Sequence, residues 1–115
     1  MSDVNQRPDC IFCKIVSRQI LTELIYEDEL LVAFNDLHPK AATHVLLVPK
    51  LHIVNLFDTD EQKAKIIGHM ANSLTAVAQK LGLSGFRTII NTGKEGSQEI
   101  MHLHMHLLHG KLKVF

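Results

Sequence analysis

Apolar and imidazole side chains alternate near the C-terminal end of the chain, over residues 101–108. Successive side chains of a β-strand point to opposite faces, so this alternation predicts a strand with one apolar face and one imidazole face. The apolar members, which we expect to face a core, are Leu103, Met105 and Leu107. The imidazoles on the other face are those of His102, His104 and His106. Three histidines in this register indicate a functional row, whereas one histidine alone would indicate ordinary surface decoration.

Shorter apolar runs predict the other strands of a sheet. Residues 24–26 and 30–34 flank a polar turn, 44–49 form a run that is stopped by a proline, and 86–91 form a fourth strand. Near the N-terminus, a short helix is predicted by the spacing of Ile11, Phe12 and Ile15.

The longest regular pattern predicts a helix that ends at Gly82, where glycine supplies a left-handed stop. Asp58 or Thr59 can cap its first turn, and Glu61 or Gln62 can complete a capping box three residues later. One apolar stripe, expected to face the sheet, consists of Ala64, Ile67, Ala71, Leu74, Ala78 and Leu81. A second row is expected to meet another subunit, the alternative being a wider core contact, and consists of Ile66, Met70, Ser73 and Val77.

The predicted order of elements is a short helix, three strands, a long helix and two strands. This order indicates an α+β fold with a five-stranded antiparallel sheet, one long helix and one short helix. The length of 115 residues suits a single domain, 1–115, in which the polar segment 1–9 is expected to be a flexible arm.

The composition limits the classes of partner. Hydrophobic residues make up 46% of the chain, but no apolar run approaches the ~20 residues of a membrane span. Lysine plus arginine and aspartate plus glutamate both number 12, so no charge excess indicates a nucleic-acid polymer or an anionic membrane as partner. The first residues lack a basic segment followed by an apolar one, so we expect no export signal and a cytoplasmic protein. A small anionic ligand is compatible with this balance, because it needs only local donors.

The histidine row favours chemistry at phosphorus. A neutral imidazole is a good nucleophile near pH 7, and flanking imidazoles can fix its tautomer and exchange protons. The loop of residues 92–98 contains two glycines that allow backbone N–H groups to approach an oxyanion. Neutral side-chain donors beside that loop are Asn91, Ser97 and Gln98. Together these groups favour phosphoryl or nucleotidyl transfer through a phosphohistidine-type intermediate.

The same row has a rival interpretation as a metal site. Two histidines at i and i+2 of a strand can chelate zinc, and a third ligand with an open position would make a catalytic centre. Three consecutive imidazoles on one face need strong strand curvature to reach one ion at bonds of about 2.0–2.1 Å, so we rank this interpretation below nucleophilic use.

The segment from His102 to Leu108 resembles the His-φ-His-φ-His-φ-φ signature of the histidine triad superfamily, in which φ is an apolar residue. The resemblance covers nearly the whole chain and is closest to the branch of histidine triad nucleotide-binding proteins, the purine nucleoside phosphoramidases. Its other matching positions are Ile11-Phe12, Phe34-Asn35-Asp36, Thr43-His44, Pro49-Lys50-Leu51-His52, Asn91 and Gln98-Glu99. It implies a homodimer whose two five-stranded sheets join into one. It also implies hydrolysis of the P–N bond of adenosine or guanosine 5'-phosphoramidates without a catalytic metal.

The resemblance also implies a role for each matching residue. His104 corresponds to the nucleophile that takes the nucleotidyl group, and its neighbours in the phosphate-binding and proton network are His102, His106 and His44. Asp36 matches the position that binds the ribose hydroxyls, although an Asx turn would also explain it. The wall of the purine cleft, for which ordinary core packing is the alternative, is matched by Ile11, Phe12, Ile15, Phe34, Asn35 and Leu37. The phosphate side, together with His104 and His106, is matched by Asn91, Gln98 and Glu99.

Cys10 and Cys13 need a separate interpretation. With two cysteines three residues apart and no export signal, we expect no structural disulfide. Part of the superfamily binds structural zinc through such a pair, the histidine after the third strand and the first histidine of the triad. The corresponding ligands here are Cys10, Cys13, His52 and His102. The alternative is a pair of reduced, partly buried thiols.

Two other functions are kept beside the phosphoramidate hydrolase. One is a nucleotide-binding sensor or scaffold protein, and the other is a dinucleoside polyphosphate hydrolase of the same superfamily. The chain also departs from the family pattern at three places. His109 stands where glycine is frequent, Met101 replaces a common tyrosine, and the tail ends early at Phe115.

Overall fold

The structure is a computed structural model and describes residues 6–111. Its elements follow one another in the order α1 Ile11–Val16, β1 Tyr26–Glu27, β2 Leu31–Asn35, β3 Thr43–Pro49, α2 Glu61–Lys80, β4 Arg87–Ile89, the 3₁₀ turn Lys94–Gly96 and β5 Met105–His109. The strands form one antiparallel sheet in the order β1-β2-β3-β5-β4. The predicted α+β fold, with five antiparallel strands, one long helix and one short helix, is confirmed.

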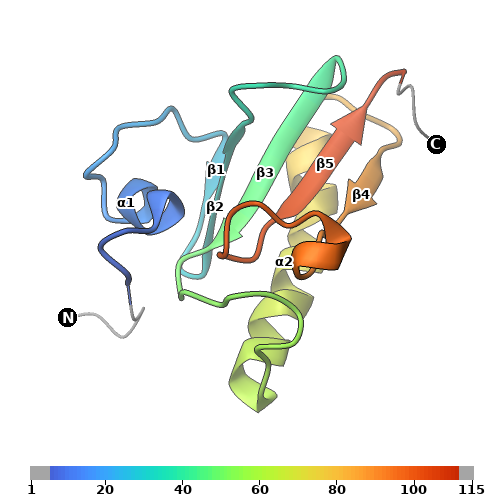
Figure 1. Cartoon of the computed structure of the whole chain (residues 1–115). Coiled ribbons are helices and arrows are strands. Elements are labelled where there is room, and N and C mark those ends of the chain that lie inside the picture. Colours follow the sequence, from blue (N-terminus) through green and yellow to red (C-terminus); the bar gives the residue numbers. More distant parts are fainter. Residues whose placement is uncertain (1–5, 112–115) are drawn as a thin grey trace.

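The two faces of the sheet are covered by different elements (Figure 1). Side chains of β2, β3 and β5 at Leu31, Leu47 and Met105 pack under α2 in the larger core cluster. On the other face, Val32 and Leu46 pack with the side chains of α1 in a second cluster. Because both faces are buried, these strands consist of nearly continuous apolar runs.

The register of the central strands brings two histidines together. Residue His44 of β3 pairs with Leu108 of β5, and Leu46 pairs with His106. Directly opposed residues of antiparallel strands share a face, so His44 and His106 are diagonal neighbours on the face that α1 covers.

The predicted strand over residues 101–108 begins later than expected, at Met105. The His102 N–H donates to the Ile100 carbonyl at 2.8 Å, and the Leu103 N–H donates to the Ile53 carbonyl at 2.7 Å, so this segment bends instead of joining the ladder. The alternation of faces is nevertheless confirmed, since Leu103 lies in the core cluster under α2. The imidazoles lie on the other side of the chain, where His102 and His104 are buried and His106 is half-buried.

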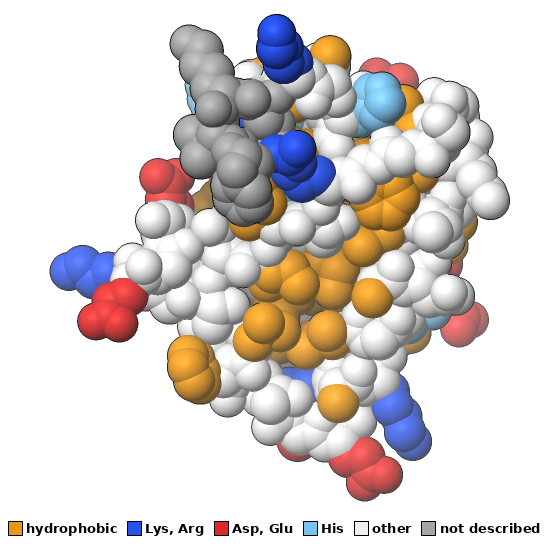
Figure 2. All heavy atoms as spheres, turned by 90° about the vertical axis from the view of Figure 1, so that its right-hand side faces the viewer, with side chains coloured by type: hydrophobic (Ala, Val, Ile, Leu, Met, Phe, Trp, Pro, Cys, Tyr) orange, Lys and Arg blue, Asp and Glu red, His pale blue; other side chains and the backbone are white. Residues whose placement is uncertain are grey.

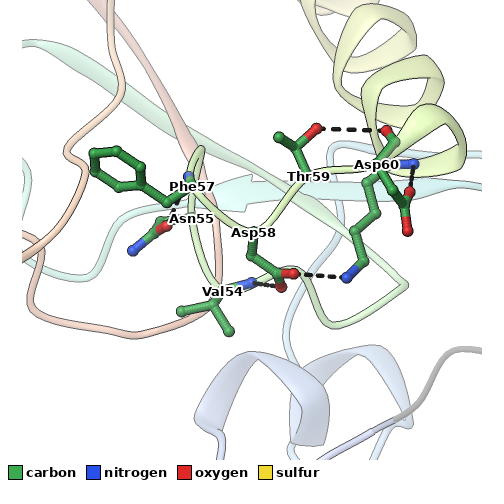
Figure 3. A network of polar contacts seen from close by, with 7 residues as sticks. Val54, Asn55, Phe57, Asp58, Thr59 and Asp60 are labelled. Atoms are coloured by element: carbon green, nitrogen blue, oxygen red, sulfur yellow. Dashed lines mark hydrogen bonds and ion pairs between the residues drawn. The ribbon is translucent and has the colours of Figure 1, made fainter.

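The predicted N-cap of the long helix is wrong by one or two residues (Figure 3). Asp60 caps α2 by accepting the Lys63 N–H at 2.8 Å, and Lys63 cannot complete a capping box. Asp58 instead closes the preceding turn, accepting from the Val54 N–H at 2.9 Å and from the Lys63 ammonium at 2.7 Å. The predicted stop is confirmed, because Gly82 has a positive φ of 76°.

Both apolar rows of α2 contribute to the core, so the second row has the wider core contact that was the alternative to a subunit interface. The row predicted to meet another subunit is buried against the sheet, with Leu74 and Ala78 beside it; its members are Ile66, Met70, Ser73 and Val77. In the stripe predicted to face the sheet, Ala64 and Ala71 are exposed and Ile67 is only half-buried. Both rows are apolar, so only the position of the sheet decides how far each one is covered.

The ends of the described chain bear on two further expectations. Of the expected arm 1–9, the described part is bound to α1, since the Arg7 N–H donates to Cys13 Sγ at 3.3 Å. Residues 1–5, and the tail that ends at Phe115, lie outside the described residues. His109, which stands where glycine is frequent in the family, donates from Nδ1 to the Gly85 carbonyl at 2.8 Å.

Among residues 6–111, no helix is both long enough and apolar enough to cross a membrane.

A carboxylate connects the β1–β2 turn to α2. Asp28 Oδ1 accepts the N–H groups of Leu30 and Leu31 at 2.8 and 3.0 Å. Its Oδ2 accepts from His69 Nε2 at 2.7 Å and from the Tyr26 hydroxyl at 3.0 Å. Burial alone would raise the pKa of Asp28, but the hydrogen bonds that the carboxylate accepts outweigh burial and hold the pKa below its usual value.

We expect Asp28→Asn to lower the free energy of unfolding at pH 7 by about 1–2 kcal/mol, because the amide loses the charge that holds His69. A carboxylate with a lowered folded pKa stabilises the fold above its unfolded pKa, and this contribution is lost as the pH falls through the folded pKa. The difference from wild type should therefore be complete above about pH 5 and shrink as the pH falls below 3.8, the ordinary pKa of the carboxyl group. Urea unfolding at several pH values measures it, with the exposed Glu29→Gln as control, and a difference unchanged at pH 3 would contradict the prediction.

Candidate active site and metal cluster

His104 is held as a neutral imidazole with one free nitrogen. Its Nδ1 lies 2.8 Å from the His102 carbonyl oxygen, which can only accept, so Nδ1 carries the proton and Nε2 has the lone pair. Burial lowers the pKa of His104 below its usual value, against smaller opposing contributions from the His102 carbonyl and Asp36. The ring is 8% exposed and packs edge-on against Phe12, with centroids 5.1 Å apart. The arrangement gives an oriented nucleophile that is neutral at pH 7.

His44 and His106 form a second fixed pair beside it. The Lys40 N–H donates to His44 Nδ1 at 3.1 Å, so the His44 proton is on Nε2. That Nε2 lies 2.8 Å from His106 Nδ1, which therefore accepts, and His106 carries its own proton on Nε2. Burial lowers the pKa of His106 to about 4, and the neighbouring imidazoles contribute further. The rings of His104 and His106 are in contact, with centroids 5.0 Å apart, so a ring with a free lone pair and a ring with an N–H donor are neighbours.

Asp36 lies next to this pair. Its N–H donates to the His44 carbonyl at 2.9 Å, and its Oδ1 accepts the His38 N–H at 2.8 Å, which is the expected Asx turn. Its Oδ2 lies 3.4 Å from His44 Nε2. The ribose contact implied by the resemblance stays a prediction, and the turn leaves a half-buried carboxylate oxygen on the side of the histidines.

The side-chain amides expected on the phosphate side are used to hold the glycine loop. Gln98 accepts from the Gly93 N–H at 2.8 Å and from Asn55 Nδ2 at 3.2 Å, and it donates to the carbonyls of Val54 and Ile100 at 2.8 and 3.0 Å. In the same loop Asn91 Nδ2 donates to the Gly96 carbonyl at 2.8 Å. These bonds give Gln98 a supporting role that its position in the sequence did not indicate. Its buried amide has a partner for every polar atom.

The residues expected to form the purine cleft divide into two groups. Phe12, Ile15 and Phe34 are buried together, and the rings of Phe12 and Phe34 have centroids 5.8 Å apart. Asn35 is exposed, Leu37 is 88% exposed and Ile11 is 45% exposed. The buried group has the core packing that was the alternative for it, and its role toward a purine stays a prediction.

Glu99 is exposed and lines an open cavity of about 490 Å³. Other residues around the cavity are Arg7, Asp9, Ile11 and Met101, and two members of the cysteine–histidine cluster, Cys10 and His52, also line it. The cavity therefore reaches the cluster from the side of Glu99.

Cys10, Cys13, His52 and His102 come together as the resemblance implies. One ligand atom from each lies within 4.8 Å of all the others. His102 Nδ1 is 3.2 Å from Cys10 Sγ, and His52 Nδ1 is 3.2 Å from Cys13 Sγ. Because His102 Nε2 donates to the Pro49 carbonyl at 2.8 Å, its Nδ1 has a lone pair directed at the sulfurs.

This donor set fits zinc. Two thiolates and two imidazoles around one point are the ligands of a closed tetrahedral zinc site. Burial raises the pKa of the Cys13 thiol to about 11, so in the absence of a cation this thiol keeps its proton at neutral pH. A bound cation would favour the thiolate and offset the desolvation of the sulfur.

The histidine row therefore does not converge on a single ion. His102 belongs to the cysteine cluster, whereas His106 groups with His44 and Asp36. His104 Nδ1 is bonded to a carbonyl group. The rival interpretation, in which all three imidazoles of the row bind one catalytic zinc, does not fit this geometry.

A five-stranded antiparallel sheet crossed by one helix, with an imidazole row at the end of a central strand, defines a histidine triad domain. Residues 9–114 match the family model described as scavenger mRNA decapping enzyme C-term binding. A histidine triad protein from Clostridium difficile has 44% sequence identity and a TM-score of 0.88, over 92% of this chain and 94% of that chain. The chain belongs to this family, within the histidine triad superfamily.

Two relatives carry more specific names. The purine nucleoside phosphoramidase of Escherichia coli strain K12 is 37% identical over 105 residues, which are 90% of this chain and 88% of that protein. The 14 kDa zinc-binding protein of Brassica juncea is 39% identical over 106 residues, which are 90% of this chain and 94% of that protein. The hydrolase class and a zinc-binding branch are thus both represented among the similar proteins.

Acid should destabilise the protein through its buried neutral imidazoles. His106 has a folded pKa of about 4 against an ordinary value of 6.5, so the unfolded chain takes up the proton first and stability is lost as the pH falls between these values. Solvent screening at this partly exposed site reduces the full ~3 kcal/mol to about 1–2 kcal/mol. His106→Gln should therefore lose less unfolding free energy than wild type between pH 7 and pH 4. Urea titrations at both pH values measure the loss, with the exposed His38→Gln as control. Equal losses of unfolding free energy in His106→Gln and wild type would show that the His106 imidazole does not cause the acid destabilisation.

Proposed function

We propose that the protein is a purine nucleoside 5'-phosphoramidate hydrolase that works through a covalent His104–nucleotide intermediate. The observation that carries this proposal is the orientation of His104, whose Nδ1 is bonded to the His102 carbonyl so that Nε2 presents a lone pair. The E. coli relative named purine nucleoside phosphoramidase supports the choice of P–N bond. The substrates would be phosphoramidates of AMP or GMP, and no catalytic metal is part of the proposal.

In the first step His104 Nε2 attacks phosphorus. The N–P bond to the histidine forms as the P–N bond to the amine breaks, and the leaving nitrogen keeps the electron pair of that bond and takes a proton from solvent. The Nε2–H of His106 is the nearby donor for a phosphate oxygen, since its other nitrogen accepts from His44. Water then attacks phosphorus and gives a proton to solvent. The bond to His104 breaks, its electron pair returns to Nε2, and the nucleoside 5'-monophosphate is released.

The loop between β4 and β5 supplies the second set of donors in this proposal. Bonds from Gln98 and Asn91 fix the loop around Gly93 and Gly96. The N–H groups of Gly93 and Gly96 donate within the loop itself, so the main-chain donors proposed for the phosphate are those of other loop residues, held without reorganising during the reaction. The carboxylate of Asp36 would accept from the ribose hydroxyls.

His104→Ala should lower kcat for an adenosine 5'-phosphoramidate with a fluorescent amine by at least about a thousandfold, because the attacking atom is removed. AMP affinity, measured by calorimetry, should change by only a few-fold. His38→Ala, exposed and outside the site, is the matched control. Turnover retained in His104→Ala would exclude the covalent mechanism. The assay is repeated with a chelator while circular dichroism monitors folding, because removing a structural metal can unfold the protein.

The same assay distinguishes the two other functions. A folded wild-type protein that binds AMP but turns over no phosphoramidate would favour the sensor or scaffold protein. Faster cleavage of a dinucleoside polyphosphate than of any phosphoramidate would favour the dinucleoside polyphosphate hydrolase. The oriented nucleophile is compatible with either leaving group, so the ratio of the two kcat/KM values decides between them.

We also propose a structural zinc ion at Cys10, Cys13, His52 and His102. The convergence of the four ligand atoms and the zinc-binding Brassica relative support it. Zinc there would connect α1 to the segment before β5, which are far apart in the sequence. No step of the reaction uses it.

The proposed assembly is a homodimer in which two sheets join at β4. β4 is at the edge of the sheet, and an edge strand presents unpaired main-chain groups. On α2, His69 bonds to Asp28 and Lys80 bonds to the Ile25 carbonyl, so that flank faces β1. The opposite flank, with Ile67 and Ala71, is therefore on the side of β4. Figure 2 looks onto this side and shows an apolar patch near its centre.

Ala71→Glu should convert the dimer to a monomer, because it places a charge in the proposed interface while the residue is exposed in the single chain. Light scattering coupled to size exclusion measures the mass. Ala76→Glu, exposed on the other flank of α2, is the matched control and should leave the dimer intact. A dimer that persists in Ala71→Glu, or a monomeric wild type, would overturn the proposed interface.

A further inference from the structure

His102 belongs to the cysteine–histidine cluster and also binds the nucleophile His104. Its ring belongs to the cysteine–histidine cluster, with Nδ1 3.2 Å from Cys10 Sγ and 3.7 Å from Cys13 Sγ. Its main-chain carbonyl accepts the Nδ1–H of His104 at 2.8 Å. The side chain and main chain of one fully buried residue therefore connect the cluster to the nucleophile.

We propose that His102 is a positioning residue that makes the orientation of His104 depend on whether the cysteine–histidine cluster holds a metal ion. The inference rests on the proposed function for its catalytic consequence, but the coupling itself is a property of the fold. Ligation would fix the His102 ring and thereby the plane of its carbonyl. Loss of the ion would leave that carbonyl, and the hydrogen bond that orients His104, less constrained.

The position of the ring is set from two sides. Its Nε2 donates to the Pro49 carbonyl at 2.8 Å, so the end of β3 holds one edge of the imidazole. The other edge faces the sulfurs of Cys10, the N-cap of α1, and of Cys13 within α1. Without an ion, the contact at Nδ1 is a weak thiol–imidazole hydrogen bond at 3.2 Å, and a metal bond at this atom would restrain the ring more strongly. Both states keep the same tautomer, so the coupling needs no proton transfer.

Phe12 provides a second connection between the cysteine–histidine cluster and His104. It precedes Cys13 in α1, and its ring contacts His102 and His104 with centroid distances of 5.7 and 5.1 Å. A metal ion that holds Cys10 and Cys13 would hold α1 in place, and with it the aromatic ring that packs against the nucleophile. The two connections act on the same imidazole, one through its hydrogen bond and one through its packing.

The local backbone makes the segment responsive to this constraint. Residues before Met105 lie outside the β5 ladder, and the N–H of His102 bonds locally to the Ile100 carbonyl. A residue inside a ladder would have its carbonyl direction set by the neighbouring strand. The peptide unit that carries the His102 carbonyl is held instead by the Leu103 N–H, which donates to the Ile53 carbonyl at 2.7 Å, and on its other side by the His102 side chain.

The test observes the His104 Nδ1–H directly by NMR, using protein labelled with ¹⁵N in histidine rings. Wild type is compared after loading with one equivalent of zinc and after removal of metal by a chelator, with folding checked by circular dichroism. We expect a sharp, protected Nδ1–H resonance in the zinc state and at least tenfold faster exchange with solvent in the metal-free state. Zinc added back to wild type should restore protection. Similar exchange in both states, or no binding of zinc by wild type, would overturn the proposal.

Two variants separate coupling from a general effect on α1. Cys10→Ser weakens the cluster and should show fast exchange that zinc does not reverse. Ser17→Ala removes a hydrogen bond to the Lys14 carbonyl at the other end of the helix and should behave as wild type. If Ser17→Ala also accelerates exchange, the effect comes from the helix as a whole and the proposal fails.

Kinetics provide the catalytic readout. For Cys10→Ser we expect at least a tenfold lower rate of nucleotidyl transfer in single turnovers, with AMP affinity within about twofold of wild type, because orientation affects the attack more than ground-state binding. Equal single-turnover rates for Cys10→Ser and wild type would overturn the catalytic part. NMR coupling in a protein without turnover on any phosphoramidate would contradict the proposed function and leave the coupling intact.

Discussion

Hydrogen bonds between imidazoles and the main chain set the chemistry of this site. A neutral imidazole has one N–H and one lone pair, so the partner of one nitrogen decides what the other nitrogen can do. Carbonyl groups of His102 and Pro49 each accept from an imidazole, and the N–H of Lys40 donates to a third. These main-chain groups lie in or near β3 and β5. The histidines therefore have defined roles only when the central strands have paired.

Burial gives the same imidazoles their neutrality. His102 has no exposed surface and His104 is 8% exposed, so the charged form of either ring would be poorly solvated. Burial accordingly lowers the pKa of both, in His102 to about 4. A buried polar group without a partner would cost about 1–3 kcal/mol, so the bonds that select the tautomers also offset the desolvation of the rings. The neutral form is the one whose lone pair can attack phosphorus or bind a metal ion.

The sequence predicted the elements and their faces because the alternation of apolar and polar residues is a local property. Its predictions failed where two local patterns were equally good and a tertiary contact decided between them. Asp58 and Asp60 both suit an N-cap, but the turn at Val54 uses the carboxylate of Asp58. Both apolar rows of α2 could cover a sheet, and spacing alone cannot show where the sheet lies. The four bonds of Gln98 connect segments that are distant in the sequence, so a local pattern indicated its amide only as a free donor.

The division of the histidine row explains how neighbouring imidazoles can serve a metal cluster and a nucleophile. If their lone pairs pointed to one place, a metal ion would bind both and remove the nucleophile. The chain bends before Met105, so His102 directs Nδ1 toward the cysteines while His104 directs Nδ1 toward a carbonyl group. Phe12 packs edge-on against both rings and fills the space beside them. The lone pair of His104 is therefore kept apart from the cluster, although the two sites share a residue. A regular strand through His102 would have aligned the two rings and lost this separation.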